Sequence, residues 1–149
     1  MKMKSLLSGL LLVLITGTSY SQDCNKKFFG TYGINLDATI ASIREADPSK
    51  QNEEVPQQFL DNINQLTLEI FADSMAITVM GQRQALRITP RASSLDGASC
   101  DLLLDIPGVD LPEEQTPFVT IYEGKNNTLM IKSTNGSDDM DNFIWMKIE

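Results

Sequence analysis

The sequence predicts a mostly β fold, in which about eight antiparallel strands run as a meander and close into a small barrel or half-barrel. Two observations lead to this prediction. From Leu66 to Glu149, short stretches of alternating apolar and polar residues are separated by turn-length segments rich in Gly, Asp, Asn and Ser. Between residues 36 and 65, apolar residues instead recur at helical spacing, which predicts a short helical insertion after the first strand.

The first strand and the insertion have clear local signals. Residues 28–34 (FFGTYGI) are aromatic and contain glycines, as in a strand that bends. A helix is predicted to begin at Leu36, with Asp37 placed to cap its start. It should end at Asp47, because the residue before a proline is disfavoured in a helix. Pro56 fits the first turn of a second helix with one apolar face.

The remaining strands are predicted from period-two alternation. They are expected at residues 66–70, 75–79, 85–89, 100–106, 118–123, 129–131 and 142–148, with turns at 72–74 and at Gly81-Gln82. In the 100–106 strand, Cys100, Leu102, Leu104 and Ile106 form the expected inward row, and Asp101 and Asp105 point outward. Residues 107–117 form a loop with three prolines and several acidic residues.

The inward rows are also the candidate lining of a ligand cavity, since a barrel of about eight strands holds either a filled core or one small ligand. The candidate lining residues are Leu68, Ile70, Met75, Ile77, Val79, Leu86, Ile88, Leu102, Leu104, Val119, Ile121, Leu129 and Ile131. A filled core requires the same apolar rows, so both interpretations stay open at this point.

The first 21 residues are typical of a secretory signal peptide. Two lysines precede an apolar run over residues 6–15, and Ser19-Tyr20-Ser21 offers small residues for cleavage before Gln22. The run is shorter than the about 20 apolar residues that span a bilayer. We therefore expect an exported protein, periplasmic or extracellular, whose residues 22–149 form one domain without a transmembrane span.

Composition excludes several classes of function. Residues 1–21 contain two lysines and no acidic residue. Residues 22–149 therefore hold 10 basic and 20 acidic residues, and their net charge is −10. Such a charge disfavours nucleic acid and anionic membrane surfaces. The chain has no histidine, which rules out a histidine-based triad or zinc site.

No pattern of residues predicts catalysis or a bound metal. Glycine-rich phosphate loops are absent, and the acidic residues fall in turns and on outward strand positions. The turn over residues 137–142 is rich in oxygen ligands but lacks the spacing of an EF-hand, which favours a solvated turn over a calcium site. We expect a protein that is not an enzyme, with no cofactor and no metal.

Residues 22–149 contain two cysteines, Cys24 and Cys100. In an oxidising compartment an even pair predicts a disulfide, and two separate thiols are the alternative. A disulfide would close a loop of about 75 residues, and the loop-entropy model assigns such a loop roughly 4 kcal/mol.

The segment Phe29-Gly30-Thr31-Tyr32 resembles the Gly-x-Trp signature at the first strand of the lipocalin superfamily, with Tyr32 where tryptophan is usual. The order of strand, helices, meander and a last strand carrying Lys147 is similar to that of small exported bacterial lipocalin-like (calycin-type) proteins. The resemblance implies a lipocalin-like barrel in which Gly30, Tyr32 and Lys147 close the base. A lysine above the Tyr32 ring would gain roughly 0.5–1 kcal/mol of cation–π energy.

Two functions are consistent with these patterns. The first is non-catalytic binding of a small hydrophobic ligand inside a lipocalin-like barrel. The alternative is a filled barrel that acts as a protein-interaction or inhibitor module through its loops, including residues 107–117. A cavity above about 300 Å³ would favour the first, and a closed core with an exposed apolar loop would favour the second.

Overall fold

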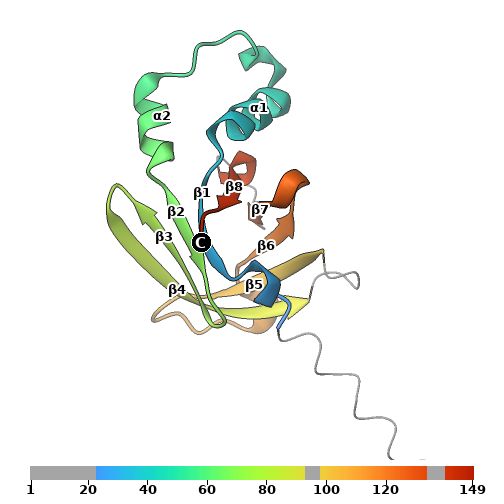
Figure 1. Cartoon of the computed structure of the whole chain (residues 1–149). Helices are drawn as coiled ribbons and strands as arrows, with labels where there is room; N and C mark the ends of the chain where they lie inside the picture. Colours follow the sequence, from blue (N-terminus) through green and yellow to red (C-terminus); the bar gives the residue numbers. More distant parts are fainter. Residues whose placement is uncertain (1–22, 93–97, 134–139) are drawn as a thin grey trace, which may run out of the picture.

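The structure is a computed structural model that describes residues 23–92, 98–133 and 140–149, in which eight strands form a closed barrel (Figure 1). Each strand pairs antiparallel with the next, and β1 also pairs with β8, which closes the sheet. The strands are β1 (Gly30–Ile34), β2 (Thr67–Ile70), β3 (Ser74–Val79), β4 (Gln82–Ala92), β5 (Ser99–Asp105), β6 (Phe118–Glu123), β7 (Thr128–Ser133) and β8 (Ile144–Lys147). The predicted mostly β barrel is therefore confirmed, whereas the predicted signal peptide lies outside the described residues.

Two helices connect β1 to β2 and lie together at one end of the barrel (Figure 1). They are α1 (Leu36–Ala46) and α2 (Gln57–Asn64). The predicted cap at Asp37 is wrong: the side chain of Asn35 accepts a hydrogen bond from the backbone N–H of Ala38 at 3.1 Å, whereas Asp37 already lies within the first turn. The end of α1 before Asp47-Pro48 is confirmed, and Pro56 stands one residue before α2 rather than inside it.

Buried hydrogen bonds join α1 to the last strand. Thr39 is fully buried, and its hydroxyl oxygen accepts from the backbone N–H of Ile144 at 2.9 Å. The backbone N–H of Asn35 donates to the carbonyl oxygen of the same Ile144 at 2.8 Å. A threonine within a helix thus satisfies a strand backbone group that would otherwise be buried without a partner.

The hairpin between β3 and β4 turns one residue earlier than the sequence suggests. Met80 and Gly81 occupy the two turn positions, with φ angles of 50° and 80°. Two consecutive left-handed residues match the twist of a two-residue hairpin, and glycine adopts this conformation without strain. Strand β4 is also longer than the predicted 85–89, and its residues 82–86 pair with β3 beyond the end of β5.

The barrel interior is an apolar core built around Trp145, which is fully buried. One expectation about the end of a strand needs correction. Ile106 is 40 % exposed, because β5 ends at Asp105 and the chain then leaves the inward row. Leu103, an outward position in that strand, is only 8 % exposed, because the loop that follows β5 turns back beside it.

The two ends of the barrel differ in what lies across them. At the base, a 3-10 turn, η1 (Lys26–Phe28), precedes β1, and the β2–β3 and β6–β7 turns lie at this end. At the opposite end are α1, α2, the β3–β4 turn and the β5–β6 loop. We call these the base and the helical end.

Candidate functional site

The residues predicted to close the barrel come together at the base. Tyr32 is 4 % exposed, and its hydroxyl donates to the carbonyl oxygen of Phe28 at 2.7 Å. Tyr32 and Lys147 are direct partners between β1 and β8. The Lys147 side chain runs over Gly30, where an added Cβ would lie 2.6 Å from Lys147 Cε.

The lysine contact differs in detail from the expected one. The cation–π contact found at this end places Lys27 Nζ 4.8 Å from the centre of the Phe28 ring, whereas Lys147 lies over the glycine. Burial, together with the negative charge of Glu123, raises the pKa of the Tyr32 hydroxyl above its usual value. The phenol therefore stays neutral at ordinary pH and donates its hydrogen bond.

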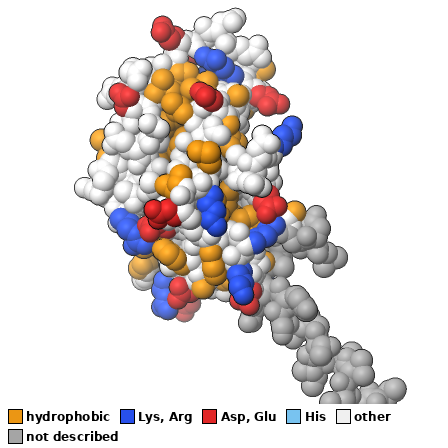
Figure 2. Space-filling model, in the orientation of Figure 1, with side chains coloured by type: hydrophobic (Ala, Val, Ile, Leu, Met, Phe, Trp, Pro, Cys, Tyr) orange, Lys and Arg blue, Asp and Glu red, His pale blue; other side chains and the backbone are white. Residues whose placement is uncertain are grey.

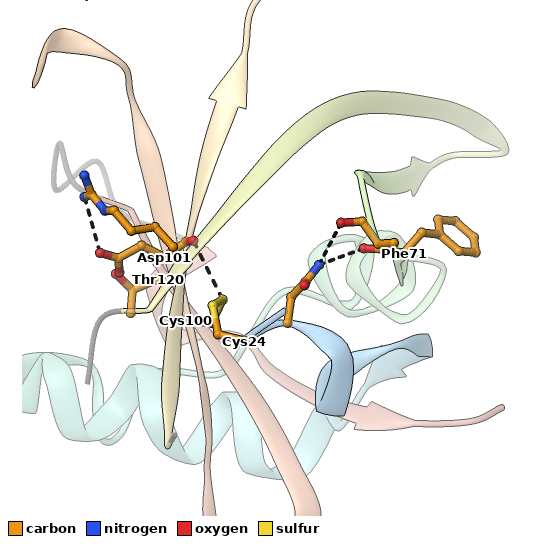
Figure 3. The surroundings of a disulfide bond; sticks show 8 residues. Cys24, Phe71, Cys100, Asp101 and Thr120 are labelled. Carbon is orange, nitrogen blue, oxygen red and sulfur yellow. Dashed lines mark hydrogen bonds and ion pairs between the residues drawn. A yellow bond between two sulfur atoms is a disulfide. The ribbon is translucent and has the colours of Figure 1, made fainter. Parts of the chain in front are cut away.

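A disulfide joins Cys24 to Cys100 across 76 residues, which confirms the predicted pairing (Figure 3). The neighbouring Asn25 is buried, and its side-chain amide donates to the carbonyl oxygens of Phe71 at 2.9 Å and Ala72 at 3.2 Å. The segment before β1 is thus attached covalently to β5 and by hydrogen bonds to the β2–β3 turn.

The candidate cavity-lining residues are gathered in the barrel, where most of them pack against one another. Seven belong to the buried core cluster, namely Leu68, Ile70, Ile88, Leu102, Ile121, Leu129 and Ile131. Four are partly buried against it: Met75, Ile77, Leu104 and Val119. Leu86 is half-buried, and Val79 is 39 % exposed because it is the last residue of its strand before the turn.

One polar group in this core lacks a partner. The indole N–H of Trp145 is buried, and no hydrogen-bond acceptor for it lies within the described part of the molecule. The Phe143 ring contacts the indole edge-on, with the ring centres 6.4 Å apart. A buried donor without an acceptor costs about 1–3 kcal/mol, so this group has a strong preference for any acceptor that reaches it.

The sequence did not predict a hollow between the β5–β6 loop and the barrel. We call this hollow of about 400 Å³ the loop hollow. Its lining residues are Thr89, Leu103, Leu104, Asp105, Ile106, Val109, Asp110, Leu111, Thr116 and Pro117. The available signal was the recurrence of single aliphatic residues among the proline, the glycine and the aspartate of residues 106–111.

The loop hollow combines exposed apolar side chains with acidic groups. Ile106, Val109 and Leu111 are 40 %, 48 % and 39 % exposed. Asp105 and Asp110 lie in the same lining. Such a surface can accept an apolar side chain and hold a cation beside it.

A second, smaller groove of about 210 Å³ lies at the helices, where its lining includes Ile40, Ile43, Val55 and Phe59. Figure 2 shows apolar side chains gathered in this upper part of the molecule. Charged groups border the groove, and the guanidinium of Arg44 donates to the carbonyl oxygen of Glu53 at 3.3 Å.

The described residues also bear on metal sites and membrane spans. In residues 23–92, 98–133 and 140–149, no group of three or more Cys, Asp or Glu side chains is arranged to hold a metal ion. Half of the acidic turn considered for calcium, residues 137–139, lies outside this range. None of the helices described is long and apolar enough to cross a membrane.

Comparison with known proteins leaves the architecture as the main guide to function. No protein-family model, no curated protein and no solved structure matches this chain. The lipocalin-like relationship therefore stays a prediction, and what the structure shows is the closed eight-stranded barrel.

Proposed function

We propose that this protein is an exported, non-catalytic interaction module that binds a partner protein through the loop hollow. The observation that carries the proposal is the exposure of Ile106, Val109 and Leu111 around this hollow. Exposed aliphatic side chains on one loop are a common mark of an interaction site. The packed interior favours this role over storage, because the inward rows fill the barrel with their own side chains.

The chemistry of the hollow indicates what the partner presents. An apolar side chain would contact Leu103 and Val109, and an adjacent lysine or arginine would meet the carboxylates of Asp105 and Asp110. The net negative charge of residues 22–149 would attract such a basic segment and so speed its approach.

Export is part of the same proposal. The signal-peptide pattern of residues 1–21 is the first support. The disulfide is the second, because disulfides persist in oxidising compartments such as the periplasm and the extracellular space.

A peptide selection tests the interaction. The purified domain would be used to select binders from a displayed library of random short peptides. We expect the selected peptides to pair a large aliphatic or aromatic residue with a neighbouring lysine or arginine. Val109→Ser combined with Leu111→Ser should abolish their binding, and Met80→Ser, which removes a side chain that is 70 % exposed on the β3–β4 turn, should not. Selected peptides without a basic residue, or binding that survives the double substitution, would contradict the proposal.

A small hydrophobic ligand inside the barrel is the second candidate, and the unpartnered indole N–H of Trp145 favours it. A ligand with a carbonyl or carboxylate oxygen would supply the missing acceptor. Native mass spectrometry of the protein purified from its own host tests this candidate. An added mass of a few hundred daltons that is lost on denaturation, and is absent in Trp145→Phe, would support it. An unmodified mass in both proteins would count against it.

A further inference from the structure

A third hollow, of about 420 Å³, lies at the base of the barrel, and we call it the base hollow. Its lining comes from η1, β1, the β6–β7 turn and β8, which are far apart in the sequence. Phe28, Tyr32 and Leu129 form a buried apolar floor, with exposures of 2 %, 4 % and 1 %. The volume lies within the range of sites for small molecules.

The walls of the base hollow carry two lysines. Lys27 Nζ lies 3.4 Å from the carboxylate of Glu123, and both side chains are partly exposed. Lys147 has no carboxylate within ion-pair distance among the described residues. In residues 22–149, where acidic residues outnumber basic ones by 20 to 10, a hollow lined by two lysines and one glutamate is unusual.

The fold leaves room for one of these cations. Gly30, at a φ of 141°, leaves room for the Lys147 side chain, and Lys147 Nζ would be 3.3 Å from a Cβ at that position. The exposed Lys147 side chain therefore passes over Gly30 and places its ammonium group in the lining of the base hollow.

We propose that the base hollow binds a small monocarboxylate with a short apolar tail. The carboxylate contacts Lys147, with Lys27 as the second cation, and the tail contacts Phe28 and Leu129. Two lysines and one glutamate give the lining a net charge of +1, which matches a monoanion. A dianion such as phosphate would be repelled by Glu123 and would gain nothing from the apolar floor.

Binding of hexanoate tests the proposal, with hexan-1-ol and hexylammonium as probes of the same length but different charge. Titrations of isotope-labelled protein would be followed by amide chemical shifts. We expect saturable shifts at residues of the lining, including Leu129 and Met146, with hexanoate. Hexan-1-ol should bind about tenfold more weakly, because it lacks the charge-assisted contact, and hexylammonium weaker still.

Three variants are expected to affect the binding of hexanoate differently. Lys147→Met should weaken hexanoate binding about tenfold, since it removes the unpaired cation but keeps the aliphatic chain. Glu123→Gln should tighten binding about threefold or more, because it frees Lys27 and removes a repelling charge. Lys50→Met is the matched control: it makes the same change in an exposed lysine of the segment between α1 and α2, and should leave binding unchanged. Circular dichroism and thermal unfolding would verify that each variant is folded.

Several results would overturn the proposal. They are the absence of hexanoate binding up to about 10 mM, equal binding of hexan-1-ol, unchanged binding in Lys147→Met, or weaker binding in Glu123→Gln. The base hollow shares no lining residue with the loop hollow. The outcome here is therefore independent of the interaction proposed for the loop.

Discussion

Replacing both cysteines by alanine should remove a large part of the stability of this domain. The disulfide closes a loop across a sequence separation of 76 residues. The loop-entropy model assigns a closure of this length about 4.5 kcal/mol at 25 °C. Most native domains are stable by only about 5–15 kcal/mol, so the loss would bring the barrel close to its unfolding threshold.

The expected shift in melting temperature follows from the size of the domain. For residues 23–149, the entropy of unfolding is about 0.27 kcal/mol/K, so the loss corresponds to a decrease of roughly 17 °C. Cys100 is fully buried, and alanine at this position avoids the cost of burying a hydroxyl group.

Urea unfolding, followed by Trp145 fluorescence, and thermal unfolding would measure the loss. The double variant Cys24→Ala with Cys100→Ala should agree with the unsubstituted protein under reducing conditions, because both lack the cross-link. A loss below about 1 kcal/mol in both would refute the reasoning. It would mean that residual structure in the unfolded chain already restricts this loop without the cross-link.

Three further predictions concern single residues. Gly30→Ala should destabilise the barrel by about 1–3 kcal/mol in urea unfolding, since its φ of 141° strains other residues and the new Cβ would meet Lys147. Asn35→Ala should cost about 1 kcal/mol through the lost helix cap, and an equal or larger cost for Asp37→Ala would contradict the capping assignment. The pKa of Tyr32 is raised in the folded state, so its contribution to stability is fully present below the unfolded pKa of about 10 and is lost as the pH rises through the folded pKa. The unfolding free energy should therefore fall more steeply above pH 10 than that of Tyr32→Phe, and parallel curves would argue against this assignment.

Local patterns predicted the elements of this fold with good accuracy. Strand β6 was predicted at its observed bounds, Phe118–Glu123, and the end of α1 followed from Asp47-Pro48. Alternation also predicted that Leu68 and Leu102 would face the core, because side-chain direction in a strand depends only on the period-two geometry of the backbone.

The mispredictions fall where the structure departs from local rules. The exposure of Ile106 depends on where β5 ends. Helix α1 begins at Leu36 as predicted, but its cap is Asn35, because Asn35 directly precedes the first turn and Asp37 lies within it. The alternation of apolar and polar residues does not show where β5 ends or which residue caps α1.

The sequence by itself determined the strand order, the helical insertion, the two cysteines that can pair and the acidic charge of the domain. These properties depend on neighbouring residues or on composition. Only the tertiary structure decided that the barrel closes on a packed core and that Lys27, Glu123 and Lys147 line one hollow. The reason is physical: closure brings β1 beside β8, and the distances between side chains on those strands depend on the register of the whole sheet.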